Sequence, residues 1–357
     1  MELYLCRRLS KIMISFILPI LDEVQNIEKT IQSIISQTID KNYEIIVADG
    51  MSTDGTKEII QEYQTKNSSI RLIDNPERIV STGFNRALSE SKGNIILRVD
   101  GHTNLEKDFL ANCLEVMAKK DVACVGGATI HTGKGIIGQS IALAQSSYFG
   151  VGGVNFRKEQ KTGKYVDTLA FGAYQRSVFS KYGGYDEELI RNQDDEFNFR
   201  IIQNGEKIWL DPSIISTYVT RNSFLKLFEQ YFQYGFYKIR VFQKRGGFTS
   251  WRHFIPFIFI ISLLISIVLF IKGWGIPIKV LLGLYFSQSI LFSIIETKRP
   301  RSNIFSIIIL PFTFFILHTS YGLGSLIGFL FYIKRWKGNN INDSKLNKEL
   351  FNENTIS

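Results

Sequence analysis

Three long apolar runs in the last third of the chain limit its architecture more than any other feature. They cover residues 254–271, 276–295 and 304–333 and contain hardly any charged side chains. A helix needs ~20 apolar residues to cross the hydrocarbon core of a bilayer, so we predict a transmembrane region over residues 253–337. The polar residues 338–357 that follow are typical of a disordered tail.

The third run does not fit one upright span. As a single helix rising ~1.5 Å per residue it would extend for about 45 Å, and Pro311 and the segment 318–322 interrupt it. It is therefore either one tilted span or a broken, re-entrant hairpin. We favour the hairpin, because basic residues at both ends of this run predict that both ends face the same side.

An aromatic and basic segment precedes the apolar runs. Residues 222–252 are rich in Phe and Tyr, with basic side chains between them, and the whole chain carries a net charge of +9. Aromatic and basic side chains together can bind nucleic acid. Next to a membrane-spanning run, however, they favour an amphipathic helix at the interface. We therefore expect membrane lipids as partners and no nucleic acid.

The distribution of basic residues predicts the orientation of the protein. Arg240 and Arg252 precede the first apolar run, and Lys298 and Arg299 follow the second. Because loops rich in Lys and Arg stay in the cytoplasm, both sites predict a cytoplasmic side. We expect an integral protein of a bacterial-type cytoplasmic membrane with the N-terminal domain on its cytoplasmic face.

The N-terminus resembles a signal peptide only superficially. Arg7, Arg8 and Lys11 precede the apolar residues 12–21, but that run is short, contains Pro19 and lacks a small-residue cleavage site. We interpret it as a buried first strand.

Short apolar runs alternate with helical patterns through the first half of the chain. The predicted strands cover 13–19, 44–48, 70–73 and 95–99, and the predicted helices 24–39, 56–63 and 82–89. This alternation indicates an α/β fold with a parallel sheet covered on both faces. Ligands bind at the carboxyl ends of the strands in such sheets, where Pro19, Asp49 and Asp100 would lie.

Asp100 and His102 follow the fourth predicted strand. A carboxylate and an imidazole two residues apart at a strand end suit a divalent cation, Mn²⁺ or Mg²⁺. Taken alone, His102 could equally be a histidine satisfied within the protein. Its pairing with Asp100 after a buried strand favours the metal site.

The segment 49–56 has a polar pattern that suits a nucleotide. Asp49, Ser52 and Asp54 offer carboxylates and a hydroxyl beside a helix start, where phosphate groups bind readily. The same residues are also common in plain turns and helix caps. Glu23 has the weaker claim, since a lone acid in a first helical turn often only complements the helix dipole.

A second acidic cluster lies about ninety residues further along the chain. Gln193 is followed by Asp194, Asp195 and Glu196, and three adjacent acids repel one another unless a cation or substrate is near. One of these carboxylates could act as a general base. Between the two acidic sites, the glycine-rich residues 126–153 could form a flexible loop over a substrate, although the glycines could equally be turn formers.

Together these motifs resemble the inverting glycosyltransferases of family 2, which have a GT-A fold. The resemblance covers roughly residues 12–215 and uses residues 19–23, 49–56, 100–102 and 193–196. It implies a GT-A domain over residues 1–221, a Rossmann-like fold that binds a nucleotide-diphosphate sugar.

The resemblance also assigns roles to individual residues. The donor nucleotide would contact Pro19, Glu23, Asp49, Ser52, Asp54 and Asp100. Asp100 and His102 would hold the metal. Asp194 would be the catalytic base that deprotonates an acceptor hydroxyl. Asp195, Glu196 and Arg200 would contact the acceptor or support the site.

Two departures from the family pattern refine the resemblance. The family usually has Asp-x-Asp where this chain has Asp100-Gly101-His102, and Glu-Asp where it has Gln193-Asp194. The second departure leaves open whether Asp194 or Asp195 is the base. The combination is most similar to succinoglycan-type exopolysaccharide glycosyltransferases with C-terminal membrane segments. The Gln-x-x-Arg-Trp string of processive synthases does not occur in the sequence, so transfer of a single sugar is implied.

The resemblance and the membrane region together predict a function. We expect a metal-dependent enzyme that moves one sugar from a nucleotide sugar, of the UDP type, to a polyprenyl-diphosphate-linked glycan during extracellular or capsular polysaccharide synthesis. Two alternatives remain: a polyprenyl-phosphate sugar synthase, and a noncatalytic membrane scaffold with a degenerate nucleotide site. The donor sugar, the linkage and the oligomeric state stay open.

Overall fold

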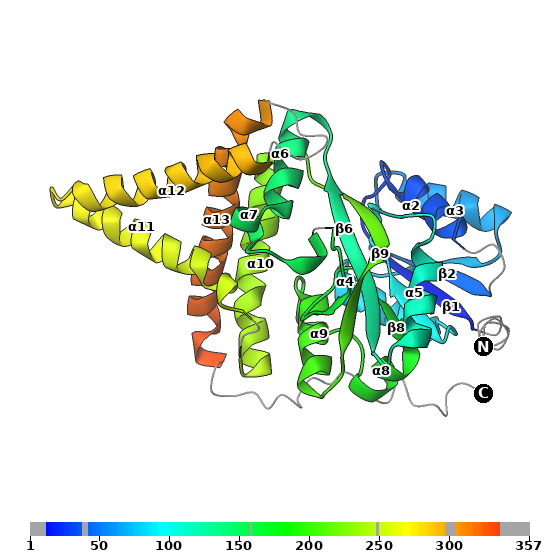
Figure 1. Cartoon of the computed structure of the whole chain (residues 1–357). Helices are drawn as coiled ribbons and strands as arrows, with labels where there is room; N and C mark the ends of the chain where they lie inside the picture. Colours follow the sequence, from blue (N-terminus) through cyan, green and yellow to red (C-terminus); the bar gives the residue numbers. More distant parts are fainter. Residues whose placement is uncertain (1–11, 38–41, 158, 248–249, 297–304, 336–357) are drawn as a thin grey trace. The chain divides into compact units, whose positions relative to one another are not determined.

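The computed structural model describes residues 12–37, 42–157, 159–247, 250–296 and 305–335 (Figure 1). They divide into two compact units. The signal-like basic residues 7–11, the basic loop 298–301 and the tail 338–357 lie outside the described residues, so the predictions for them stay predictions.

The two units are not consecutive in the sequence. The first contains the chain up to Ile130 together with Lys158–Tyr218, and the second combines His131–Arg157 with the described residues from Val219 onward. The boundary that we predicted after residue 221 lies close to Val219. Residues 131–157, however, which we placed in the first domain, group with the C-terminal helices.

The first unit is built on a nine-stranded sheet in the order β3-β2-β1-β4-β8-β6-β9-β5, with β7 beside β9. Its strands are β1 (Ile14–Ile20), β2 (Tyr43–Asp49), β3 (Ile70–Asp74), β4 (Ile95–Arg98), β5 (Thr103–Leu105), β6 (Cys124–Thr132), β7 (Lys164–Tyr165), β8 (Ala173–Gln175) and β9 (Ile208–Val219). Its helices are α2 (Ile27–Ile35), α3 (Thr56–Lys66), α4 (Val80–Glu90), α5 (Phe109–Lys119), α8 (Arg176–Tyr182) and α9 (Gln193–Gln203).

The parallel half of the sheet agrees with the prediction. β1 pairs in parallel with β2 and β4, and β2 pairs in parallel with β3. Every residue of β1 is buried, as expected for a strand covered on both faces. The apolar run after the basic N-terminal residues is therefore a core strand.

The other half of the sheet was not predicted. β8 pairs antiparallel with β4 and β6, and β9 pairs antiparallel with β5 and β7. The glycine-rich residues 126–153, for which we considered a flexible loop or plain turns, contain most of β6 and the helices α6 (Gly135–Ser146) and α7 (Tyr148–Val151). Gly127 serves close packing here, because a Cβ on it would lie 1.7 Å from Ile214 O.

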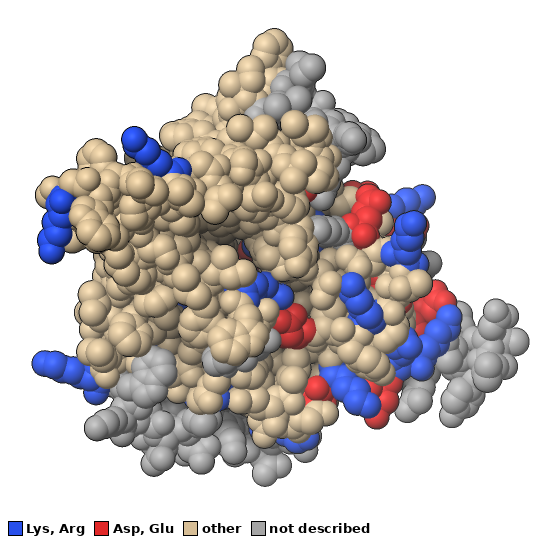
Figure 2. All heavy atoms as spheres, turned by 60° about the vertical axis from the view of Figure 1, so that its left-hand side comes forward, with Lys and Arg blue, Asp and Glu red and all other residues tan. Residues whose placement is uncertain are grey.

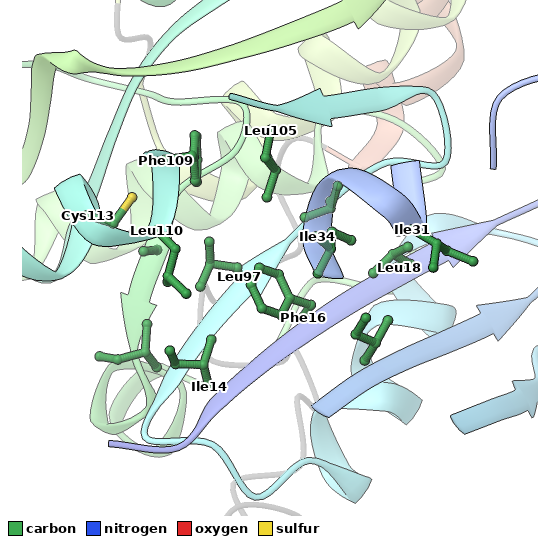
Figure 3. Close-up of a cluster of buried hydrophobic side chains, with 14 of the residues drawn as sticks. Ile14, Phe16, Leu18, Ile31, Ile34, Leu97, Leu105, Phe109, Leu110 and Cys113 are labelled. Carbon is green, nitrogen blue, oxygen red and sulfur yellow. The ribbon is translucent and has the colours of Figure 1, made fainter. Parts of the chain in front are cut away.

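The core of the first unit lies between the sheet and its helices (Figure 3). Phe16 and Leu18 of β1 point to the same face as Leu97 of β4, since alternate residues of a strand share a face. Ile31 and Ile34 of α2 cover this face, and so do residues of α5 such as Phe109 and Leu110. This packing fixes the carboxyl ends of β1 and β4 relative to one another.

The second unit is helical. Besides α6 and α7 it contains α10 (Phe224–Arg245), α11 (Ile255–Ile271), α12 (Ile276–Glu296) and α13 (Phe305–Tyr332). Among the described residues, three helices are long and apolar enough to cross a membrane: Trp251–Ile271, Ile276–Glu296 and Ile308–Tyr332. Figure 2 brings α11 and α12 forward, and the surface there is almost free of charged side chains.

The third apolar run forms one continuous helix, α13, and not the broken hairpin that we favoured. Pro311 lies inside this helix. A proline there removes one backbone hydrogen bond, and the packing of α13 against its neighbours offsets that loss. Half of the 18-residue apolar stretch of α13 is buried, whereas only 11% of the corresponding stretch is buried in α11 and in α12.

His318 of α13 joins three parts of the second unit. Its Nε2 donates to the carbonyl of Phe149 in α7 at 2.9 Å, and its Nδ1 accepts from the Tyr285 hydroxyl of α12 at 2.8 Å. Nearby, the hydroxyls of Ser140 in α6 and Thr313 in α13 bond at 2.6 Å. His318 is thus a helix-packing residue that ties residues 131–157 to the apolar helices.

Glycines allow α10 and α13 to approach closely. A Cβ on Gly324 would lie 2.0 Å from Phe232 O, and one on Gly235 would lie 2.1 Å from Tyr321 O. Small residues at such positions are typical of helix pairs in membranes. We expect Gly324→Ala to lower stability by about 1–3 kcal/mol through overpacking, measured as a fall in the thermal unfolding temperature in detergent.

The control is Gly283→Ala in α12, where a Cβ would meet nothing within 4 Å. This variant should unfold at or slightly above the wild-type temperature, because Ala favours a helix more than Gly does. Equal unfolding temperatures for the two variants would contradict the close packing of α10 and α13.

Candidate functional site

The first part of the site is a pair of loops after β1 and β2. Asp49, the last residue of β2, accepts from the backbone N–H of Ser52 at 3.0 Å and from its hydroxyl at 2.5 Å. Across the gap, Asp22 N donates to Ser52 Oγ at 2.9 Å, and Thr53 N donates to Asp22 Oδ1 at 2.9 Å. The two loops therefore form one hydrogen-bonded platform. Pro19 lies just before it, buried in β1 and paired with Ala48.

Asp54 braces the same loops. Its Oδ1 accepts from the backbone and hydroxyl of Thr56, and its Oδ2 accepts from Val24 N at 3.0 Å. Burial raises the pKa of Asp54, but these hydrogen bonds outweigh it, so the pKa lies below its ordinary value. Ser52 and Asp54, which we predicted as donor contacts, thus bond to the protein itself and set the shape of the loops.

Backbone strain gathers around the site. Within the described part of the chain, the non-glycine residues with positive φ are Asp22, Met51, Arg78 and Asn192. Asp22 and Met51 belong to the two bonded loops, and Asn192 immediately precedes the second acidic cluster. Each such residue costs on the order of 1–3 kcal/mol, and strain of this kind is concentrated at functional sites.

His102 is held by Glu23. Its Nδ1 lies 2.6 Å from Glu23 Oε1, and its ring packs edge-on against Tyr218 with the centroids 4.6 Å apart. Gly101 permits this approach, because a Cβ there would lie 2.8 Å from Glu23 Cγ. The sequence suggested that Glu23 contacts the donor; in the structure its carboxylate orients the imidazole.

This arrangement suits a metal ligand. His102 Nε2 is buried and has no hydrogen-bond partner among the described residues. Histidines that bind metals commonly bond through the other ring nitrogen to a carboxylate, as Nδ1 does here. The described residues contain no group of three or more His, Cys, Asp or Glu arranged to hold a metal. Asp100 and His102 are the residues that could hold a cation here, and its other ligands would come from substrate phosphates and water.

Arg98 connects the two acidic sites, a role that we did not predict. Its Nη2 donates to Asp100 Oδ1 at 2.6 Å, and its Nη1 donates to Asp194 Oδ2 at 3.1 Å. Burial would lower the pKa of Arg98, but the two carboxylates raise it well above its ordinary value. We predicted Arg98 only as part of the strand over residues 95–99. A charged residue inside such a run was the available signal.

Asp194 occupies the first turn of α9. Asn192, with φ of 62°, ends the preceding loop, and Asp194 Oδ1 accepts from the N–H of Asp195 at 2.9 Å. The positive end of the helix dipole favours a carboxylate at this position. Gln193, which stands where the family usually has Glu, is buried, and its Oε1 has no hydrogen-bond partner among the described residues.

Glu196 and Arg200 form a buried ion pair beneath the site. Arg200 Nη2 donates to Glu196 Oε2 at 2.7 Å, and the guanidinium also donates to the carbonyls of Tyr182 and Gly184. These contacts fasten α9 to the turn that precedes it. Of the two roles that we predicted for this pair, the geometry fits support of the site.

We expect Arg200→Met to destabilise the protein by about 3–5 kcal/mol, because the fully buried Glu196 carboxylate would lose its guanidinium. Thermal unfolding in detergent measures the effect. Lys66→Met is the control, since Lys66 and its partner Glu62 are both exposed; exposed pairs contribute little. Equal unfolding temperatures for the two variants would contradict the structural role of the buried pair.

Comparison with a solved structure shows the fold class of the chain. A mannosyltransferase from Pyrobaculum calidifontis, PcManGT, whose structure holds GDP-Man and Mn²⁺, is similar with a TM-score of 0.54 and 17% sequence identity. The match covers 92% of this chain and 94% of that chain. At this identity the likeness concerns the fold, which is the GT-A glycosyltransferase fold.

Sequence comparisons identify the family. The family model "Glycosyl transferase family 2" matches residues 15–183. A protein of Methanococcus voltae, named dolichyl N-acetyl-alpha-D-glucosaminyl phosphate 3-beta-D-2,3-diacetamido-2,3-dideoxy-beta-D-glucuronosyltransferase, is 31% identical over 87% of this chain and 95% of its own length. The succinoglycan biosynthesis protein ExoA of Rhizobium meliloti is 29% identical over 67% of this chain and 73% of its own length. The chain belongs to glycosyltransferase family 2.

These matches confirm the predicted family, its likeness to the succinoglycan type and the glycosyltransferase class. The roles of the individual site residues stay predictions. The structure brings Asp100 and Asp194 together through Arg98, and it joins Glu23 to His102.

Proposed function

We propose that this enzyme transfers one sugar, with inversion, from a UDP-sugar to a polyprenyl-diphosphate-linked glycan at the cytoplasmic face of a membrane. The observation that carries the proposal is the link from Asp100 through Arg98 to Asp194. It supports the proposal because it joins Asp100, which would hold the donor, to a carboxylate on a separate helix, and transfer between two substrates requires such an arrangement.

The donor would lie over the loops after β1, β2 and β4. Asp49 would accept hydrogen bonds from the base of the nucleotide, and the braced loops around Ser52 and Asp54 would hold the backbone that faces it. Mn²⁺ or Mg²⁺, held by Asp100 and His102, would stabilise the negative charge of the departing nucleoside diphosphate. The orphaned Nε2 of His102 supports this assignment.

The acceptor would react through a hydroxyl. Asp194 takes the hydroxyl proton while the oxygen bonds to the anomeric carbon, and the bond from that carbon to the diphosphate breaks with its electrons. Because attack and departure occur on opposite faces of the sugar, the configuration inverts. Glu196 and Arg200 keep α9, and so Asp194, in place.

Two observations support a lipid-linked acceptor. The Methanococcus voltae relative carries in its name a dolichyl-phosphate-linked sugar as acceptor. The described residues of the second unit also include three helices long and apolar enough to span a membrane. Membrane anchoring would keep the enzyme where such acceptors reside.

The test is nucleotide release from membranes that contain the wild-type protein with Mn²⁺. The donors are UDP- and GDP-sugars, and the acceptors are polyprenyl phosphate, lipid-linked glycans with one or two phosphates, and soluble glycans. We expect release with a UDP-sugar and a diphosphate-linked glycan, abolished by a chelator. Release with soluble glycans alone would overturn the acceptor, and release with bare polyprenyl phosphate would instead indicate a polyprenyl-phosphate sugar synthase.

A further inference from the structure

One buried guanidinium bridges two carboxylates that come from distant parts of the chain. Asp194 is 96 positions from Arg98 in sequence, whereas Asp100 is its near neighbour. The Arg98 side chain is only 7% exposed, against 20% for Asp100 and 28% for Asp194. The Arg98 guanidinium is thus fixed inside the protein, and the two carboxylates that it binds are more exposed to solvent.

Aromatic rings lie beside the Arg98 guanidinium. Its guanidinium carbon lies 6.0 Å from the ring centre of Tyr185, which stacks in turn on Phe84 with centroids 4.1 Å apart. Burial raises the pKa of Tyr185, so this phenol stays neutral. Arg98 therefore bears the positive charge that the two carboxylates face.

A stabilising role alone does not explain this arrangement. A buried ion pair often stabilises a protein no more than apolar residues of similar size would, because removing charges from water is costly. A planar guanidinium has a second property: its nitrogens point in fixed directions, so it sets the spacing of the groups that it binds. At Arg98 those groups are the Asp100 and Asp194 carboxylates.

We propose that Arg98 is a positioning residue that fixes the base Asp194 relative to the donor held at Asp100. This inference rests on the roles given to Asp100 and Asp194 in the proposed function. Arg98 donates no proton to the reaction. The acceptor proton passes to Asp194, the acceptor oxygen bonds to the anomeric carbon, and the bonding electrons leave with the nucleoside diphosphate.

The proposal predicts that losing Arg98 harms turnover and not donor binding. In Arg98→Met, Asp194 would no longer be held, and a misplacement of ~1 Å can cost 10²-fold in rate. We expect kcat to fall by about 10²-fold. The affinity for UDP with Mn²⁺ should not weaken, because the variant removes a cation beside the metal site. Arg98→Lys should recover only part of kcat, since an ammonium does not reproduce the guanidinium fork.

A double-mutant cycle separates positioning from a general structural role. If Arg98 acts through Asp194, then Arg98→Met combined with Asp194→Asn should be as active as Asp194→Asn alone, within about twofold. The control is Arg176→Met, which removes a partly buried arginine of the first unit, bonded to Gly93 O and Ser91 Oγ. Its effect should multiply with that of Asp194→Asn.

The measurements are kcat and donor KM for nucleotide release, with acceptor and with water alone, and a separate titration of UDP with Mn²⁺. Multiplying effects of Arg98→Met and Asp194→Asn, or an equal loss of nucleotide affinity in Arg98→Met, would overturn the positioning role. Release to water needs no lipid. If acceptors do not stimulate nucleotide release by the wild-type enzyme, the proposed acceptor is wrong. The double-mutant cycle of Arg98→Met and Asp194→Asn, measured on release to water, then still decides the role of Arg98.

Discussion

Replacement of Asp194 by Asn is expected to lower sugar transfer by about 10²- to 10⁴-fold, the usual contribution of a general base. The amide keeps the size of the side chain but does not accept the acceptor proton. Binding of UDP with Mn²⁺ should stay near the wild-type value, because Asp49, Asp100 and His102 are unchanged. The measurement is acceptor-dependent nucleotide release at saturating donor.

Asp195→Asn is the matched comparison, since the adjacent acid leaves the choice of base open in the sequence. The Asp194 side chain accepts a hydrogen bond from the same Arg98 guanidinium that holds Asp100. We expect the Asp195 variant to retain far more activity. A larger loss in Asp195→Asn than in Asp194→Asn would move the base to Asp195.

Replacement of His102 by Leu is expected to weaken the Mn²⁺-dependent binding of UDP by at least 10- to 100-fold, about the range found for groups that support metal ligands. Leu fills the space beside Tyr218 but has no nitrogen for a cation. Titration of UDP into the purified protein, with and without Mn²⁺, measures the loss independently of transfer.

Glu23→Gln tests the group behind the histidine. Gln keeps an oxygen that can accept from His102 Nδ1 but removes the charge, so the loss of affinity should be smaller than in His102→Leu. Both variants should bind UDP without metal as the wild type does. If the wild-type protein binds UDP equally well with and without Mn²⁺, a role of His102 in metal binding is excluded.

The parallel half of the sheet could be predicted because its signal is local. β1, β2 and β4 are short apolar runs, and the helices between them show their own periodicity. Several antiparallel strands escaped prediction because their own sequence signals are weak: β7 has two residues, β8 has three, and β6 contains two adjacent glycines. Gly127 of β6 could have been a turn former, whereas it allows close packing against Ile214 of β9.

The site could be predicted in its acids but not in its connections. Asp49, Asp100 and Asp194 follow patterns of spacing that a sequence displays. The bonds from Arg98 to two carboxylates, and from Glu23 to His102, depend on which loops meet in space. The hairpin that we favoured for residues 304–333 was wrong because we read Pro311 as an interruption, whereas a packed helix tolerates a proline that an isolated helix would not.

Residues 131–157 have a practical consequence for anyone who would isolate the catalytic fold. In α6, Ile141 and Ala144 are buried against Leu227, Leu310 and Phe314. A chain that ends after β9 would keep α6 but lose these partners, so the apolar face of α6 would be exposed to solvent. A soluble truncation ending near residue 221 would therefore be prone to aggregate. For the same reason, the apolar helices cannot be exchanged by themselves. A chimaera with the membrane region of a relative would also need that relative's α6 and α7.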